Sequence, residues 1–163
     1  MVNLEGRAHR LERALAAAAG RWDICLIDCP PSLGLLTVNA LVAARHLLVP
    51  LQCEFFALEG LSQLLQTVER IRGAFNPDLA ILGVALTMFD RRNNLSTAVS
   101  EDVRACLGGA VFETVVPRNV RLSEAPSHGL PALIYDLRCP GSEAYVRLAK
   151  EIIGRLPQLA EAA

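Results

Sequence analysis

Asp28 is the residue whose surroundings most strongly suggest chemistry. It closes the apolar run 24–27 and is followed at once by a Cys-Pro-Pro segment. A short, β-branched apolar run predicts a buried strand of a parallel sheet over residues 23–28. Asp28 would then lie at the carboxyl end of that strand, where open α/β sheets place ligands and where a carboxylate can support Mg²⁺ on phosphates. The alternative is that Asp28 only ends a strand and that the prolines form a rigid turn.

A phosphate-binding loop that could work with this aspartate is absent from the printed sequence. Such a loop needs glycines whose backbone N–H groups approach the phosphates, followed by Gly-Lys-Ser or Gly-Lys-Thr. The chain has one lysine, Lys150, which lies between Ala149 and Glu151 and far from any glycine-rich stretch. The sequence therefore presents one half of a nucleotide site.

Three further predicted strands, over residues 47–51, 80–87 and 111–116, also end in polar or conformationally special residues. These residues are Gln52, Cys53 and Glu54, then Met88, Phe89, Asp90, Arg91 and Arg92, and then Pro117, Arg118 and Asn119. Because parallel strands deliver their carboxyl ends to one edge of a sheet, four such ends in succession indicate a site. Each residue also has a simpler interpretation: Met88 covers the core, Asp90 forms a surface ion pair, and Arg118 and Arg121 are solvated loop charges.

The elements that would position these residues alternate along the chain. Apolar periodicity predicts helices over 4–19, 33–45, 58–75, 95–107 and 141–155, between the four strands and a short last strand at 132–135. Residues 117–131 form a long loop with three prolines, and Gly83 indicates close packing within its strand. This order predicts an α/β fold with a mostly parallel, doubly wound sheet in one domain spanning residues 1–163.

The composition is that of a folded chain. Hydrophobic residues make up 52% of the sequence and charged residues 20%, and the formal net charge is −1. Any contact with nucleic acid must therefore come from a local patch. No signal peptide or membrane span is expected, and the scattered cysteines predict reduced thiols in a cytoplasmic protein. The five cysteines are Cys25, Cys29, Cys53, Cys106 and Cys139.

Four separated blocks of this sequence resemble one family. They span residues 23–39, 49–61, 86–96 and 117–129, and the blocks include the texts Ile-Asp-Cys-Pro-Pro-Ser, Pro-Leu-Gln-Cys-Glu-Phe-Phe-Ala-Leu-Glu-Gly-Leu and Pro-Arg-Asn-Val-Arg-Leu-Ser-Glu-Ala-Pro-Ser-His-Gly. In these blocks the chain resembles the ParA (Soj-type) partitioning ATPases, a deviant-Walker P-loop group that also contains MinD. The resemblance covers about Leu4 to Arg155.

The resemblance implies ATP and Mg²⁺ as cofactors. Asp28 is implied as the catalytic carboxylate that orients Mg²⁺ or its water, and a wall around the adenine base is implied for Met88, Asp90, Pro117, Arg118 and Asn119. Arg118 and Arg121 are implied to contact DNA without regard to sequence. The implied partners are a ParB-like centromere-binding protein, nonspecific DNA, and a second copy or a full-length ParA, in a nucleoid-associated cytoplasmic setting without a membrane.

The chain departs from the family in lacking the Lys-Gly-Gly-x-Gly-Lys-Thr loop. In the family's sheet the strand of that loop lies between the strands expected at 23–28 and 47–51, so we expect either a gap there or direct pairing. We also expect no ATP hydrolysis by the chain alone. A non-enzymatic module that modulates a full-length ParA is the alternative. A MinD-like membrane cycle ranks last, because residues 156–163 are short, interrupted by Pro157 and faintly acidic.

Overall fold

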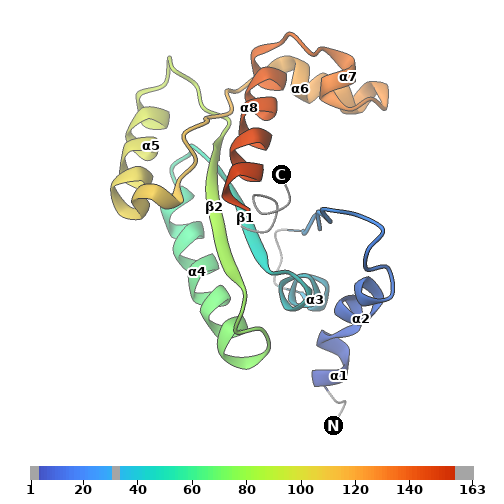
Figure 1. Ribbon diagram of the computed structural model, residues 1–163. Helices are drawn as coiled ribbons and strands as arrows, with labels where there is room; N and C mark the ends of the chain where they lie inside the picture. Colours follow the sequence, from blue (N-terminus) through green and yellow to red (C-terminus); the bar gives the residue numbers. More distant parts are fainter. Residues whose placement is uncertain (1–3, 31–33, 157–163) are drawn as a thin grey trace. The chain divides into compact units, whose positions relative to one another are not determined.

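The computed structural model describes residues 4–30 and 34–156 and is an α/β structure with a small sheet (Figure 1). The described residues cluster into two compact units. The first contains the described residues up to Leu47 together with Gln63–Ala80, and the second contains Leu48–Ser62 together with the described chain from Ile81 onward. Within these described ranges, no helix combines the length and the apolar character needed to cross a membrane.

The first unit contains the helices α1 (Leu4–Ala8), α2 (Arg10–Ala16) and α3 (Leu35–Ala43), and the later part of α4 (Ala57–Ala74). The helix expected over 4–19 is thus divided in two near His9. Asn39 joins α3 to α2, because its Oδ1 accepts from the backbone N–H groups of Arg10 and Leu11 at 3.1 and 3.3 Å. These groups begin a helix and have no acceptor within it, so the buried amide supplies the missing partner.

The strand predicted over residues 23–28 is wrong for this structure. Residues 24–30 adopt no regular secondary structure, and the side chains of Ile24 and Leu26 are 44% and 84% exposed. A strand needs a neighbouring strand for its hydrogen bonds, and none of the described residues provides one here. The turn predicted after this segment includes Pro31 and Ser32, which lie outside the described residues.

The sheet pairs β1 (His46–Gln52) with β2 (Ala80–Thr87), which confirms the two strands predicted at 47–51 and 80–87. Its backbone bonds run from Ala80 N to Arg45 O at one end and from Cys53 N to Thr87 O at the other, so the strands are parallel. In the described chain, the segment that follows α5 (Asn94–Leu107) adds two isolated parallel bridges, from Val111 to Val84 and from Pro117 to Phe89.

The strand predicted over 111–116 is therefore reduced to bridges at its two ends. Between these bridges, the carboxylate oxygens of Glu151 accept hydrogen bonds from Glu113 N at 2.7 Å and from Thr114 N at 3.0 Å. Pro117 has no N–H group to continue a ladder. The N–H groups of Glu113 and Thr114 thus find a partner outside the sheet, whereas those of Phe112 and Val116 donate to Val84 O and Leu86 O of β2 at 2.9 and 2.8 Å.

Helices make up most of the rest of the second unit, and Figure 1 shows α8 running alongside β2. The core of this unit joins Ala85 of β2, Phe112 and Val116 to Ala144 and Leu148 of α8. The elements after the sheet begin with α4 (Ala57–Ala74), α5 (Asn94–Leu107) and the 3₁₀ turn η1 (Gly108–Ala110), and continue with α6 (Val120–Glu124), the 3₁₀ turn η2 (Ala125–His128), α7 (Ala132–Tyr135) and α8 (Pro140–Arg155).

Two local predictions in this unit are corrected. The segment 132–135, expected as a last strand, is helix α7, because the carbonyl of Pro131 accepts from Ile134 N and Tyr135 N and closes a helical turn. The expected loop 117–131 contains α6 and η2. Asn119 begins α6, since its Oδ1 accepts from Arg121 N at 2.9 Å, and this single cap turns an apparent loop into a helix.

Candidate functional site

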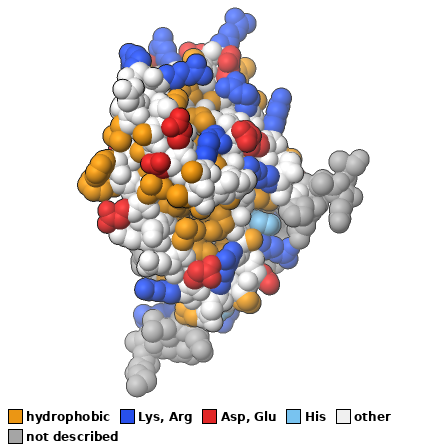
Figure 2. Space-filling view, turned by 90° about the vertical axis from the view of Figure 1, so that its left-hand side faces the viewer, with side chains coloured by type: hydrophobic (Ala, Val, Ile, Leu, Met, Phe, Trp, Pro, Cys, Tyr) orange, Lys and Arg blue, Asp and Glu red, His pale blue; other side chains and the backbone are white. Residues whose placement is uncertain are grey.

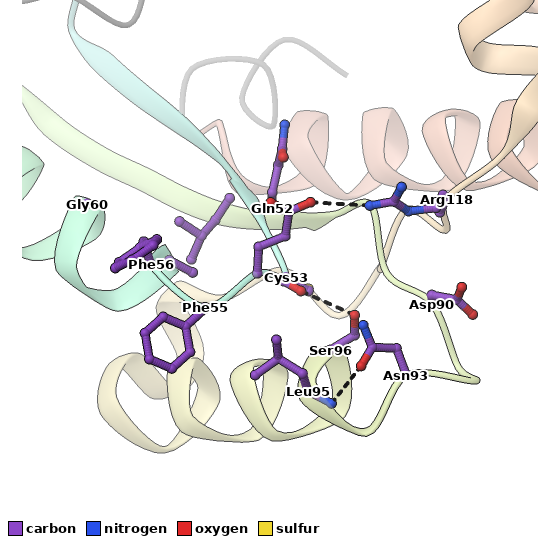
Figure 3. A pocket seen from close by; sticks show the side chains of 13 residues that line it. Gln52, Cys53, Phe55, Phe56, Gly60, Asp90, Asn93, Leu95, Ser96 and Arg118 are labelled. Carbon is purple, nitrogen blue, oxygen red and sulfur yellow. Dashed lines mark hydrogen bonds and ion pairs between the residues drawn. The ribbon is translucent and has the colours of Figure 1, made fainter.

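The second unit contains a cavity of about 800 Å³ at the carboxyl ends of β1 and β2 (Figure 3). Its walls come from the end of β1, the start of α4, the turn after β2, the start of α5 and the segment before α6. The lining residues are Leu51, Gln52, Cys53, Glu54, Phe55, Phe56, Ala57, Gly60, Asp90, Asn93, Leu95, Ser96 and Arg118. This volume suits a small-molecule ligand.

The wall on the β1 side is tied to its neighbours through Cys53. Its backbone N–H donates to Thr87 O at 3.0 Å, and its carbonyl accepts from the Ser96 hydroxyl at 3.2 Å, so β2 and α5 are both held against it (Figure 3). Cys53 is 1% exposed and Ser96 is 3% exposed. Burial raises the pKa of the Cys53 thiol above its ordinary value, although the charge of Arg104 opposes this, so the thiol stays neutral at pH 7.

The two predicted segments Met88–Asp90 and Pro117–Asn119 lie side by side. Phe89 N donates to Val116 O at 3.2 Å, and Arg118 N donates to Phe89 O at 2.9 Å. At the end of β2, Met88 has a φ of +55°, a left-handed conformation that is uncommon for a residue with a side chain. The structure thus brings together residues that are 30 positions apart in the sequence, at one edge of the sheet.

Two ion pairs set the charge of the cavity wall. Glu54 Oε1 lies 3.2 Å from Arg118 Nη2. Asp90 is held by Arg92 through three contacts, from the backbone N at 3.0 Å, from Nε at 3.2 Å and from Nη2 at 3.1 Å. These bonds from Arg92 lower the pKa of Asp90 below 3.8, and the charge of Arg118 adds a smaller attraction. The Asp90 carboxylate is therefore ionised at neutral pH.

Aromatic and amide side chains that were given no role in the sequence analysis complete the cavity. Phe55 and Phe56 are 73% and 71% exposed, and their rings meet edge to face with centroids 5.1 Å apart. Asn93 caps α5 by accepting from Leu95 N at 3.0 Å. A capping asparagine before the apolar pattern of α5 was the available signal for this wall. Figure 2 shows that hydrophobic side chains reach the surface between charged ones on one face of the molecule.

Arg121, one of the two predicted DNA contacts, forms ion pairs with two acidic side chains in the second unit. Its Nη1 lies 3.0 Å from Glu124, and its Nε lies 3.6 Å from Asp136. The hydrogen bond to Glu124, with a further contribution from Tyr135, raises the pKa of Arg121 above its ordinary value. Its positive charge is compensated locally, so it would have to exchange a carboxylate for a phosphate in order to bind DNA.

Asp28 belongs to the first unit and lies exposed in the irregular segment 24–30. Its carboxylate forms no hydrogen bond or ion pair with another residue of the described chain. The described residues also contain no cluster of three or more acidic, histidine or cysteine side chains that could enclose a metal ion. A carboxylate is one of the ligand types that Mg²⁺ accepts, together with phosphate oxygens and water.

Comparison with known proteins places these features in a family. Residues 1–81 match the family model described as an AAA domain. The chain is 61% identical over 151 residues to the chromosome partitioning protein ParA of Caulobacter vibrioides, an alignment that covers 91% of this chain and 57% of that protein.

Two solved structures have the same fold over most of the chain. One is cobyrinic acid a,c-diamide synthase from Mycobacterium smegmatis, determined with bound ADP and magnesium. It superposes with a TM-score of 0.71 at 38% identity, and the match covers 89% of this chain and 52% of the synthase chain. The cell division ATPase MinD of Pyrococcus furiosus gives a TM-score of 0.73 at 25% identity, with 90% and 58% coverage. The chain spans a little over half the length of each of these relatives. It is a homologue of the ParA chromosome partitioning proteins and corresponds to part of such a protein.

Proposed function

We propose that this chain is the C-terminal part of an ATP-dependent DNA-segregation ATPase of the ParA type. The observation that carries the proposal is the 61% identity to ParA of Caulobacter vibrioides. The cavity at the carboxyl ends of β1 and β2 supports it, because open α/β sheets bind their ligands at this edge. The homologue solved with ADP and magnesium supports the same class of ligand.

In this proposal the adenine base lies against Met88, Asp90, Pro117, Arg118 and Asn119. Asn119 keeps its amide N–H groups for the ligand, because only its oxygen is used as a helix cap. Asp28 supplies a carboxylate to Mg²⁺ or to its water. Mg²⁺ held there would supply positive charge to the phosphate oxygens.

The proposed complete domain has a mostly parallel, doubly wound sheet, of which residues 1–163 form a single partial nucleotide-binding domain. Residues 23–28 become one of its strands when a neighbouring strand supplies hydrogen bonds. In such a strand the exposed side chains of Ile24 and Leu26 lie on one face and that of Cys25 lies on the other, which supports this because a strand buried on both faces requires apolar side chains on both.

The chain alone is expected to bind Mg-ATP weakly and to hydrolyse none, since it has no lysine loop to neutralise the γ-phosphate. The test is titration of a fluorescent ATP analogue, with phosphate release measured in parallel. Asp28→Ala should weaken magnesium-dependent binding, whereas Asp23→Ala, an exposed carboxylate in the same segment, should not. Turnover by the wild-type chain that Asp28→Ala abolishes would contradict the proposed lack of hydrolysis. Analogue binding that Asp28→Ala leaves unchanged would contradict the assignment of Asp28.

The proposed macromolecular partners are nonspecific DNA, a ParB-like centromere-binding protein and a second copy, in the bacterial cytoplasm on the nucleoid. The proposed DNA contacts are Arg118 and Arg121. Binding of this kind weakens steeply with salt and depends little on base sequence. Arg121→Ala should lower the affinity for DNA of any sequence and reduce the salt dependence. Equal salt dependence in the variant would remove Arg121 from the contact.

The second candidate is a non-enzymatic module that modulates a full-length ParA. Capture of an intact ParA by a purified chain that binds no nucleotide would support this candidate over the first.

A further inference from the structure

We infer that Glu54 positions Arg118 at the cavity, so that the guanidinium presents its remaining N–H groups to the bound ligand. The inference rests on the proposed nucleotide site and gives a role to a residue to which that proposal assigned none.

The contact between the two side chains leaves most of the guanidinium available. Glu54 Oε1 meets Arg118 through Nη2 alone, at 3.2 Å, and Arg118 has no other side-chain hydrogen bond within the described residues (Figure 3). An arginine has five N–H donors in a rigid planar fork. A single contact at one corner therefore restrains the guanidinium while four donors remain without a partner in the described chain.

The backbone of each residue is held where it is. Glu54 N donates to Gln52 O at 2.8 Å, and Glu54 O accepts from Ala57 N at 3.0 Å, at the turn into α4. Arg118 N donates to Phe89 O at 2.9 Å. The ion pair therefore connects two anchored segments that are 64 residues apart in the sequence. Pre-positioned side chains lose less entropy when a ligand binds.

The other carboxylate in the cavity is already occupied. Asp90 has three contacts with Arg92, which leaves Glu54 as the carboxylate that pairs with Arg118. The side chains of Glu54 and Arg118 are 56% and 54% exposed, so the pair contributes little to the stability of the fold. A role in orientation accounts for the contact better than a role in folding.

The test is a double-mutant cycle with Glu54→Gln and Arg118→Ala in the 163-residue chain, read out by the affinity for a fluorescent ATP analogue with Mg²⁺. We expect Glu54→Gln to weaken binding about two- to fivefold, the range that an exposed ion pair supports. It should have no effect in the Arg118→Ala background. Glu59→Gln is the matched control and should leave the affinity unchanged, because Glu59 is exposed in the first turn of α4 and has no ion pair with another described residue.

A second readout needs no ligand. The Nη–H signals of Arg118 in NMR spectra recorded at low temperature should exchange faster with water in Glu54→Gln and be unchanged in Glu59→Gln, because Glu54 contacts Nη2. The inference would be overturned if Glu54→Gln weakened analogue binding equally in the wild-type and Arg118→Ala backgrounds. It would also be overturned if Glu54→Gln left the Arg118 signals unchanged. Failure of the wild-type chain to bind the analogue would refute the proposed site instead, and the NMR comparison would still decide whether Glu54 holds Arg118.

Discussion

The guanidinium of Arg155, at the end of α8, lies 4.0 Å from the centre of the Phe112 ring. Its Nη atoms also donate to the backbone carbonyls of Leu82, Ala110 and Val111 at 3.0 to 3.4 Å. One side chain thus joins the last helix to β2 and to the segment that bridges it. Cation–π contacts add about 0.5–2 kcal/mol to such an arrangement.

Gly83→Ala should destabilise the second unit, because Gly83 lies beneath this contact. A Cβ atom at this position would approach Phe112 Cε2 to 2.6 Å, Arg155 Nη1 to 2.7 Å and the backbone oxygen of Ala110 to 2.9 Å. The backbone oxygen cannot rotate away, so we expect a loss of about 1–3 kcal/mol in the free energy of unfolding, measured by urea denaturation. Gly109→Ala, where a Cβ meets nothing within 4 Å, is the control. Equal midpoints for the two variants would contradict the packing described.

Glu151→Gln should lower the free energy of unfolding at neutral pH, and it should lower it by a smaller amount in acid. Burial by itself would raise the pKa of Glu151, but the backbone N–H groups of Glu113 and Thr114 and the charge of Arg155 bring it below its ordinary value of 4.5. Because the folded-state pKa is the lower one, the carboxylate stabilises the fold above pH 4.5, and this contribution is lost as the pH falls through the folded-state pKa.

We therefore expect Glu151→Gln to cost about 1–3 kcal/mol at pH 7 in thermal or urea unfolding, with the difference from wild type narrowing below pH 4.5. Glu101→Gln should leave the stability unchanged at both pH values, because Glu101 is exposed in α5 and has no ion pair within the described part of the chain. A difference that stays constant from pH 7 to pH 3 would contradict the assigned hydrogen bonds.

Ser96→Ala should loosen the cavity wall. The Ser96 hydroxyl is buried and donates to the carbonyl of Cys53. Without this hydroxyl, the buried carbonyl loses a hydrogen-bond donor that replaces water. We expect a loss of about 1–3 kcal/mol in the free energy of unfolding. Hydrogen exchange should rise at Cys53 N, which bonds to Thr87. Ser123→Ala, on the exposed side of α6, controls for loss of a hydroxyl and should change neither quantity.

Substitutions at Met88 should separate backbone strain from side-chain packing. A left-handed φ of +55° suits asparagine and is unfavourable for a β-branched residue. We expect Met88→Val to be less stable than Met88→Asn by about 1–2 kcal/mol in thermal unfolding. The reverse order would mean that side-chain volume, and not φ, governs this position.

Much of the helical framework could be predicted from local patterns. The helices expected over 58–75, 95–107 and 141–155 correspond closely to α4, α5 and α8, because amphipathic periodicity and end signals are local properties. The close packing expected at Gly83 is confirmed by the contacts that a Cβ atom would make there. The helix α7 was missed because a four-residue apolar run satisfies helix and strand patterns equally.

The cavity could be predicted only in part. The predicted strand-end residues that line it, as expected when parallel strands share an edge, are Gln52, Cys53, Glu54, Asp90 and Arg118. Met88, Pro117 and Asn119 are not among its lining residues. The pairing of Glu54 with Arg118 and that of Arg121 with Asp136 could not be predicted, since both depend on how separate segments meet. The pair of Arg121 and Glu124 is local, because these residues are three positions apart in α6.

The amino-acid order alone determined where β1 and β2 form and which strand ends carry polar groups, because apolar runs and chain breakers act over a few residues. The tertiary structure decided the fate of the run before Asp28 and of residues 111–116. A strand exists only when a neighbour accepts its hydrogen bonds: the described chain supplies none to residues 24–30, and Glu151 takes the N–H groups of Glu113 and Thr114.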